Sequence, residues 1–107
     1  MKDWEKLQSD INTWADREFG SNVHLSRVKH LKEEVEELEE AYFCYQNPEV
    51  LKLAVTSELA DVVLLATHIA HTHDIDLFEA VSEKFTEVQT RTWLPPDADG
   101  IIRHVKK

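Results

Sequence analysis

Residues 28–45 read VKHLKEEVEELEEAYFCY, and apolar side chains recur in this stretch at alternating steps of three and four residues. The apolar positions are Val28, Leu31, Val35, Leu38, Tyr42 and Tyr45. This spacing follows one stripe of an α-helix, and it predicts a helix that begins near Ser26, a residue type that caps helix N-termini well. The same stretch carries six carboxylates between Glu33 and Glu40.

The rest of the chain predicts three more helices. Apolar stripes and capping residues place them at about residues 3–18, 48–73 and 77–93. Pro95, Pro96 and Gly100 end the last of them and leave an irregular C-terminal tail. Two glycines and three prolines supply too few turns for a many-stranded sandwich or barrel. We therefore predict an all-α fold, a compact four-helix bundle that forms a single domain over residues 1–107.

Composition limits the partners of the chain. It has 21 acidic and 12 basic residues and a formal net charge of −9, which disfavours binding of a nucleic-acid polymer through bulk charge. The single cysteine, Cys44, excludes an internal disulfide and is typical of a reducing cytoplasm. We found no apolar run of the roughly 20 residues that a membrane span requires. We therefore predict a cytoplasmic protein without a membrane partner.

Residues 59–66 read LADVVLLA, and Asp61 is the one polar side chain among them. A helix that is apolar on every side is buried on every side. Three other helices of a chain this short cannot surround a fourth completely. We therefore predict a homo-oligomer in which a second copy covers part of this surface.

Two pairs of carboxylates are expected to face each other across neighbouring helices. Glu34 and Glu37 flank the apolar stripe of residues 28–45. Glu58 and Asp61 are spaced three residues apart in the predicted helix that contains residues 59–66. A buried carboxylate must be neutralised by a proton, a cationic side chain or a metal ion. Because the facing helix offers carboxylates, the pattern predicts bound Mg²⁺, with Mn²⁺ as an alternative. The competing interpretation is a structural bundle whose acidic face is solvated.

The stretches LKEEVEEL (residues 31–38) and ELADV (residues 58–62) resemble the EExxE and ExxD motifs of the MazG-like all-α nucleotide pyrophosphohydrolases. The resemblance extends over about residues 26–106. It implies a metal-dependent enzyme that cleaves a nucleoside triphosphate, with a deoxynucleotide expected, into the monophosphate and pyrophosphate. House-cleaning of the nucleotide pool is the expected role, and dimers or tetramers are the expected assemblies.

The family motifs also imply roles for individual residues. The metal ligands and catalytic residues would be Glu34, Glu37, Glu58 and Asp61. Glu33 matches the leading glutamate of the first motif and would be a supporting group around the metal or an additional ligand. Glu37 is one candidate for the general base.

Residues 84–107 carry a net charge of +2, whereas the residues before them carry −11. Lys84 and Arg91 are seven positions apart, on one face of the last helix, and match basic family positions that could hold substrate phosphates. The alternative is that both are ordinary surface cations. Val88 departs from the family, because many members carry asparagine there, so one phosphate or sugar contact is missing or is supplied elsewhere.

Three residues near the first helix are candidates for the base of the nucleotide. Trp14, Phe19 and Asn22 could stack on a base or hydrogen-bond it, although the helical spacing of Trp14 favours core packing. His68 and His71 have the spacing of a metal-binding pair, but no third ligand has a recognisable spacing. Their role is left open, as is the base preference.

A second class of function competes with the enzyme. In this alternative, the chain is a non-catalytic helical oligomerisation or interaction module, and its acidic residues form a solvated face. That alternative leaves the aspartate within the apolar helix unexplained.

Overall fold

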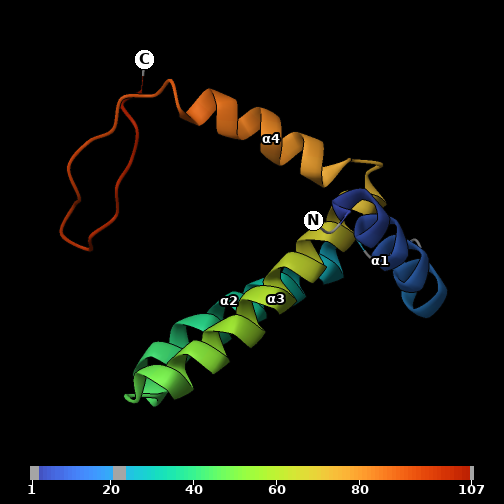
Figure 1. Ribbon diagram of the computed structural model, residues 1–107, viewed down its shortest axis with the longest axis horizontal. Helices are drawn as coiled ribbons and strands as arrows, with labels where there is room; N and C mark the ends of the chain where they lie inside the picture. Colours follow the sequence, from blue (N-terminus) through green and yellow to red (C-terminus); the bar gives the residue numbers. More distant parts are fainter. Residues whose placement is uncertain (1–2, 21–23, 107) are drawn as a thin grey trace. The chain divides into compact units, whose positions relative to one another are not determined.

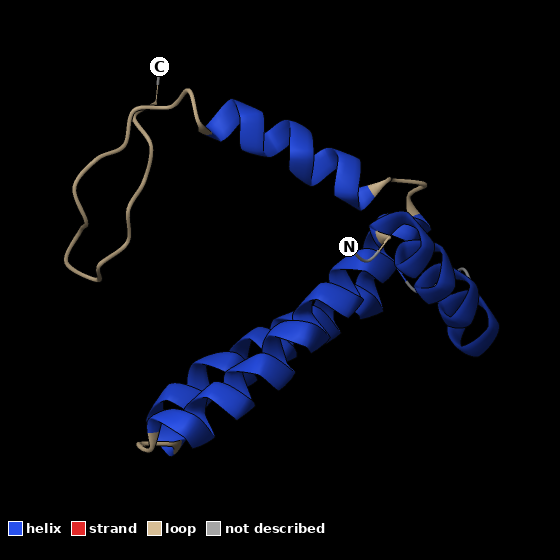
Figure 2. Ribbon diagram, viewed as in Figure 1, coloured by secondary structure: helices blue, strands red, loops and turns tan. Residues whose placement is uncertain are grey.

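The computed structural model describes residues 3–20 and 24–106, and these residues form four helices without a β-strand (Figures 1 and 2). The helices are α1 (Trp4–Phe19), α2 (His24–Cys44), α3 (Pro48–Thr72) and α4 (Leu77–Val88). The predicted all-α class and the number of helices are therefore confirmed.

Side-chain caps explain two of the helix starts. Asp3 precedes α1, and its carboxylate accepts hydrogen bonds from the backbone N–H groups of Glu5 at 3.0 Å and Lys6 at 3.3 Å. Asn47 precedes α3 and accepts in the same way from the second and third residues of that helix, at 2.9 and 3.2 Å. Pro48 then occupies the first helical position, where its missing N–H costs no hydrogen bond. Both starts agree with the sequence prediction.

Two predicted helix ends were wrong. α2 begins at His24, so Ser26 lies inside the helix and does not cap it. Neither of the residues at 24 and 25 is of a type that breaks a helix. α4 ends at Val88, before the predicted 91–93, because the N–H groups of Thr90 and Arg91 turn back to the carbonyls of Glu87 and Val88. The Thr90 hydroxyl also donates to the Glu87 carbonyl at 2.7 Å and so competes with continued helix.

The packing divides the chain into two units, residues 1–77 and 78–107, and we describe each by itself. In the first unit, α2 and α3 form a hairpin and lie side by side, and α1 packs against α3 (Figure 1). Small side chains permit this close approach, since Ala15 of α1 and Thr67 of α3 are each 1% exposed. The carboxamide oxygen of the buried Gln8 also accepts a 3.0 Å hydrogen bond from the N–H of Leu77.

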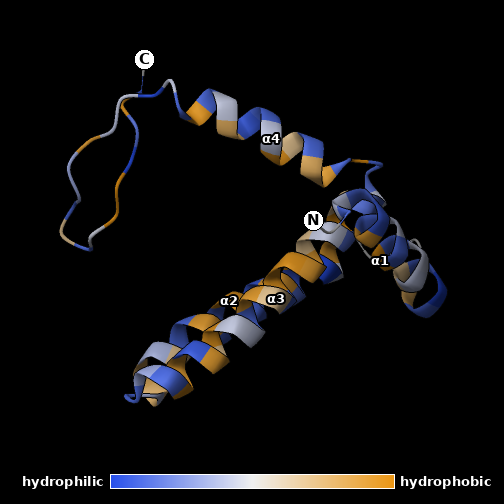
Figure 3. Cartoon of the chain, in the orientation of Figure 1, coloured by the Kyte–Doolittle hydropathy of each residue, from blue (hydrophilic) through white to orange (hydrophobic). Residues whose placement is uncertain are grey.

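α3 is the most apolar of the helices (Figure 3). Its predicted all-apolar stretch is nevertheless incompletely covered by the chain itself. Leu59, Val63 and Leu64 are 44–47% exposed, whereas Leu65 is buried. Exposed apolar surface on a helix that is apolar all round is typical of a contact surface.

The second unit contains most of α4 and the C-terminal tail. The tail folds back on itself, because the N–H of Leu94 donates to the carbonyl of Arg103 at 2.8 Å and the N–H of Val105 donates to that of Thr92 at 2.7 Å. At the tip, the carboxylate of Asp97 accepts from two backbone N–H groups and pairs with the Arg103 guanidinium. Compact packing of all four helices into one domain stays a prediction. Among the described residues, no helix is long and apolar enough to cross a membrane.

Candidate active site

Three of the predicted metal ligands converge. Carboxylate oxygens of Glu34 and Glu37 from α2 and of Glu58 from α3 all lie within 4.8 Å of one another. Glu34 and Glu37 are one helical turn apart, so they project from the same side of α2. The side-by-side packing of α2 and α3 then brings Glu58 opposite them. We call these three residues the acidic cluster.

The cluster is partly removed from solvent. The side chain of Glu34 is 13% exposed, and Nε2 of His30 lies 3.1 Å from its Oε1. Its other oxygen and Oε2 of Glu58 are buried, and neither has a hydrogen-bond partner within the described part of the chain. Buried carboxylate oxygens normally have a donor or a cation as partner, so these two oxygens indicate that the cluster binds a group from outside the protein.

Loss of solvation and the neighbouring carboxylates both disfavour the charged form of one member of the cluster. The pKa of Glu58 is raised from 4.5 to about 7, first by loss of solvation, then by the close carboxyl groups of Glu34 and Glu37 and by their charges. Over residues 3–20 and 24–106, no lysine or arginine forms an ion pair with the cluster. Close, poorly balanced carboxylate oxygens are the donor set that Mg²⁺ and Mn²⁺ prefer, so the residues fit a divalent metal.

The two other predicted carboxylates lie beside the cluster. Asp61 is half-buried and follows Glu58 by one turn of α3, but it is not one of the three residues whose oxygens converge. Its side chain is one methylene shorter than that of glutamate, so its carboxylate reaches less far from the helix. Glu33 is exposed. The roles of Asp61 as a ligand and Glu33 as a supporting group stay predictions.

The predicted phosphate-binding cations belong to the second unit and share one partner. Lys84 Nζ lies 3.2 Å and Arg91 NH2 lies 2.8 Å from carboxylate oxygens of Glu87. The hydrogen bonds from Arg91 and Lys84, together with their charges, lower the pKa of Glu87. Arg91 also lines a cavity of about 420 Å³ with Thr90 and His104. Their role toward phosphate stays a prediction.

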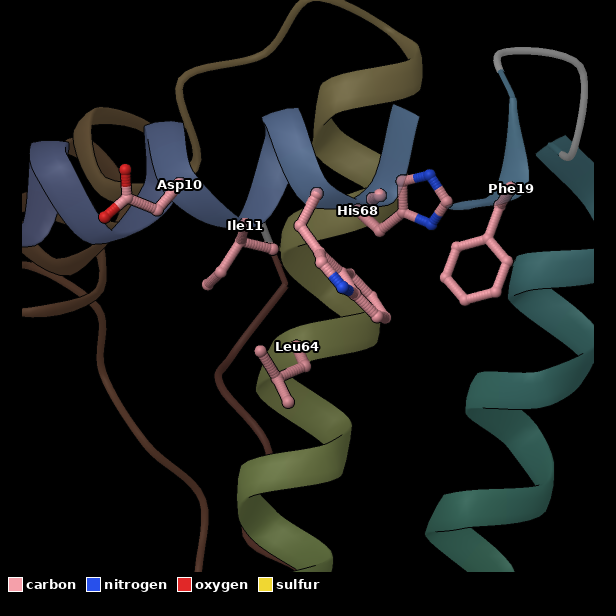
Figure 4. A pocket seen from close by; sticks show the side chains of 7 residues that line it. Asp10, Ile11, Phe19, Leu64 and His68 are labelled. Carbon is pink, nitrogen blue, oxygen red and sulfur yellow. The ribbon is translucent and has the colours of Figure 1, made fainter. Parts of the chain in front are cut away.

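Trp14 is not packed into the core of the chain, since it is 48% exposed. It lines a mainly apolar cavity of about 390 Å³ between α1 and α3 (Figure 4). We call it the α1–α3 pocket; its lining is Asp10, Ile11, Trp14, Ala15, Phe19, Leu64 and His68. The rings of Trp14 and Phe19 meet edge to face with their centroids 5.3 Å apart. The third base-contact candidate, Asn22, lies outside the described residues.

The histidines that the sequence left open have separate environments. His68 is 4% exposed and lies beside Phe19, with ring centroids 5.8 Å apart. His71 does not pair with it, because its Nε2 lies 2.8 Å from a carboxylate oxygen of Asp16. Sequence reasoning missed the placement of His68 in the pocket. The available signal was its position seven residues after Asp61, which places both on one face of α3.

Comparisons with known proteins give one related sequence and one related fold. No protein-family model matches the chain. Over 99 residues it is 31% identical to a dATP/dGTP diphosphohydrolase of Salmonella phage PMBT28, a match that covers 92% of this chain. The match covers 30% of that relative, so the chain spans about a third of the relative's length.

A solved structure extends the comparison to the fold. It is the cyanophage S-2L MazG-like pyrophosphohydrolase bound to dGDP and three catalytic Mn²⁺ ions per active site, and its sequence is 24% identical. The two structures match with a TM-score of 0.74 over 99% of this chain and 96% of that one. The chain therefore has the fold of the MazG-like pyrophosphohydrolases.

Proposed function

We propose that the chain is a MazG-like, metal-dependent nucleoside triphosphate pyrophosphohydrolase that releases the monophosphate and pyrophosphate. The acidic cluster carries this proposal, because its three carboxylates come from both sequence motifs and face each other, and no lysine or arginine among the described residues pairs with them. The matches to a dATP/dGTP diphosphohydrolase and to a MazG-like fold support the same activity.

In this proposal, Glu34, Glu37 and Glu58 hold divalent metal, with Asp61 added from the next turn of α3. The two buried, unpartnered carboxylate oxygens of the cluster are suited to this role. Bound Mg²⁺ or Mn²⁺ supplies charge neutralisation at the phosphates and a lower pKa for the attacking water. Glu37, which is more exposed than the other two, is placed to accept the proton of that water. Glu33 supports the ligands from the preceding position of α2.

The proposed substrate is a deoxynucleoside triphosphate. The named relatives act on dATP and dGTP or bind dGDP, which favours a purine deoxynucleotide. We assign Lys84 and Arg91 to binding the phosphates that the metal does not hold. On substrate binding, their N–H groups would leave the carboxylate of Glu87 and bind phosphate oxygens. We assign the base to the α1–α3 pocket, where the half-exposed indole of Trp14 offers a stacking surface. House-cleaning of the nucleotide pool in the cytoplasm is the corresponding role.

The proposal includes a homo-oligomer, a dimer or a tetramer. The exposed Leu59 and Val63 of α3 support it, since burial of such a surface stabilises an assembly. The same exposed surface is what favours the second candidate function, a non-catalytic oligomerisation module. That candidate does not explain why three carboxylates converge without a lysine or arginine partner among the described residues.

Pyrophosphate release distinguishes the two candidates. The wild-type chain and Glu58→Gln would be incubated with each nucleoside and deoxynucleoside triphosphate in Mg²⁺, in Mn²⁺ and in chelator. We expect metal-dependent release of pyrophosphate and monophosphate by the wild type and a loss of at least about a hundredfold in the variant. If the folded, oligomeric wild type cleaves no triphosphate, the oligomerisation module becomes the better account.

A further inference from the structure

The α1–α3 pocket contains one buried polar atom without a hydrogen-bond partner among residues 3–20 and 24–106. Nε2 of His68 is buried and has no hydrogen-bond partner within the described residues, and the residue as a whole is 4% exposed. The rest of the lining is almost entirely carbon, apart from Asp10. Figure 4 shows the imidazole of His68 next to the ring of Phe19, with Asp10 at the opposite end. A buried nitrogen without a partner in an apolar pocket is suited to a ligand that brings the partner.

We propose that His68 is the specificity-determining residue of the α1–α3 pocket and hydrogen-bonds through Nε2 to the edge of the bound nucleobase. This inference rests on the proposed function, because it takes the base of the nucleotide as the occupant. It adds a residue that neither the family motifs nor the comparisons assign.

The aromatic lining favours a flat ring as the occupant. Trp14 and Phe19 stand edge to face, and the guanidinium carbon of Arg27 lies 5.0 Å from the centroid of the Phe19 ring. A planar heteroaromatic ring stacks on such surfaces whatever its polar groups are, so stacking alone does not distinguish one base from another. Discrimination requires a hydrogen-bonding group at the ring edge, and His68 is the buried polar group in this lining.

The charge state of His68 suits this role. Burial lowers its pKa below the usual value, and the nearby charges of Arg27 and His71 lower it further, while Asp16 acts in the opposite direction. The imidazole is therefore neutral near pH 7. A neutral ring has one donor and one acceptor nitrogen, and its tautomer determines which pattern of base-edge groups Nε2 matches.

Helix geometry connects the pocket with Asp61, the fourth proposed metal ligand. Asp61, Leu64 and His68 follow each other at steps of three and four residues, so they lie along one face of α3. Seven residues of helix correspond to a rise of about 10 Å. In the proposed binding mode, a nucleotide lies along this face with its phosphates near Asp61 and its base at His68.

The test combines kinetics with a measurement that needs neither metal nor activity. The kinetic arm measures kcat and KM for the four common deoxynucleoside triphosphates in Mn²⁺. It compares the wild type with His68→Phe, which keeps a planar ring without nitrogen, and with His68→Asn, which keeps polar atoms. His73→Phe, at an exposed position just after α3, is the matched control. The second arm follows the ¹⁵N resonances of the His68 ring while deoxynucleoside monophosphates are added without metal.

We expect the preferred monophosphate to shift the Nε2 resonance of His68. We also expect His68→Phe to raise KM for the preferred triphosphate about tenfold and to narrow the difference between bases, with kcat retained because the base is remote from the reacting phosphate. His68→Asn should keep part of the discrimination, and His73→Phe should keep all of it.

Two results would overturn the inference without affecting the proposed function. They are an unchanged base ranking in both His68 variants and a His68 resonance that no monophosphate shifts. If no triphosphate is hydrolysed in any metal, the proposed function fails, and the metal-free titration still decides the role of His68. A shift would uphold the pocket as a site for the base, and its absence would refute it.

Discussion

Metal affinity at the acidic cluster should depend steeply on pH. The pKa of Glu58 is about 7, so near neutral pH a proton occupies the position that a metal ion needs. Metal and proton compete, and the apparent dissociation constant rises by the factor that protonation of the free site imposes. For a single group with this pKa, the factor is about 1.1 at pH 8, about 2 at pH 7 and about 11 at pH 6. We therefore expect Mn²⁺ to bind about tenfold more weakly at pH 6 than at pH 8.

Isothermal titration of the chain with Mn²⁺ at pH 6, 7 and 8 measures this dependence directly. Glu58→Gln removes the titrating group, so it should bind Mn²⁺ weakly and with little dependence on pH over this range. Glu40→Gln is the matched control, because Glu40 is an exposed residue of the same acidic helix outside the cluster, and it should behave as the wild type does. A wild-type affinity that is equal at pH 6 and pH 8 would refute the reasoning.

The same shift sets the sign of a stability effect without metal. The folded chain binds a proton at Glu58 between about pH 4.5 and 7, where the unfolded chain has released it. The contribution of this group to stability is therefore fully present below pH 4.5 and is lost as the pH rises through 7. Melting temperatures measured in chelator should show a decline over this window that Glu58→Gln lacks. Added Mn²⁺ should raise the melting temperature most at pH 8.

Three other substitutions test the fold and the second unit. Leu65→Ala should lower the free energy of unfolding by about 2–4 kcal/mol in urea denaturation, because it opens a cavity at the buried core position of α3; a loss below about 1 kcal/mol would mean that the site is not packed. Asn47→Ala removes the acceptor of two backbone N–H groups and should cost about 1 kcal/mol in the same assay, whereas Asn47→Asp should cost little. Glu87→Gln releases Lys84 and Arg91 from their shared partner and should lower KM for the triphosphate about two- to fivefold, the worth of an exposed ion pair; an increase in KM would assign Glu87 a direct role in substrate binding.

Local sequence signals predicted the features that depend on short-range chemistry. The Asn47-Pro48 pair determines the start of α3 through a side-chain cap and a fixed backbone angle, and both act within four residues. The convergence of Glu34, Glu37 and Glu58 followed from helical spacing and the packing of two consecutive helices. Charge, apolar periodicity and motif order were sufficient for this part of the site.

Features that depend on packing between distant segments were not predictable. The periodic position of Trp14 was typical of a core residue, yet it lines the α1–α3 pocket and is half exposed. Conversely, His68 is a polar residue near the end of a predicted helix, where side chains are often exposed, but it is almost fully buried. Which of the two lies inside depends on how α1 packs against α3, where the small residues Ala15 and Thr67 are fully buried. No pattern within either helix contains this information.

The acidic cluster and the α1–α3 pocket both include residues of α3. Glu58 and His68 belong to one uninterrupted helix, so the backbone fixes their separation along its axis. Their facing partners differ, because α2 completes the acidic cluster and α1 completes the pocket. A substitution that shifts α1 against α3 therefore alters the pocket and leaves the metal ligands in place. Under the proposed assignment, a change at the contact between α1 and α3 would alter base selection and leave the acidic cluster unchanged, since the two sites share one helix but use different neighbours.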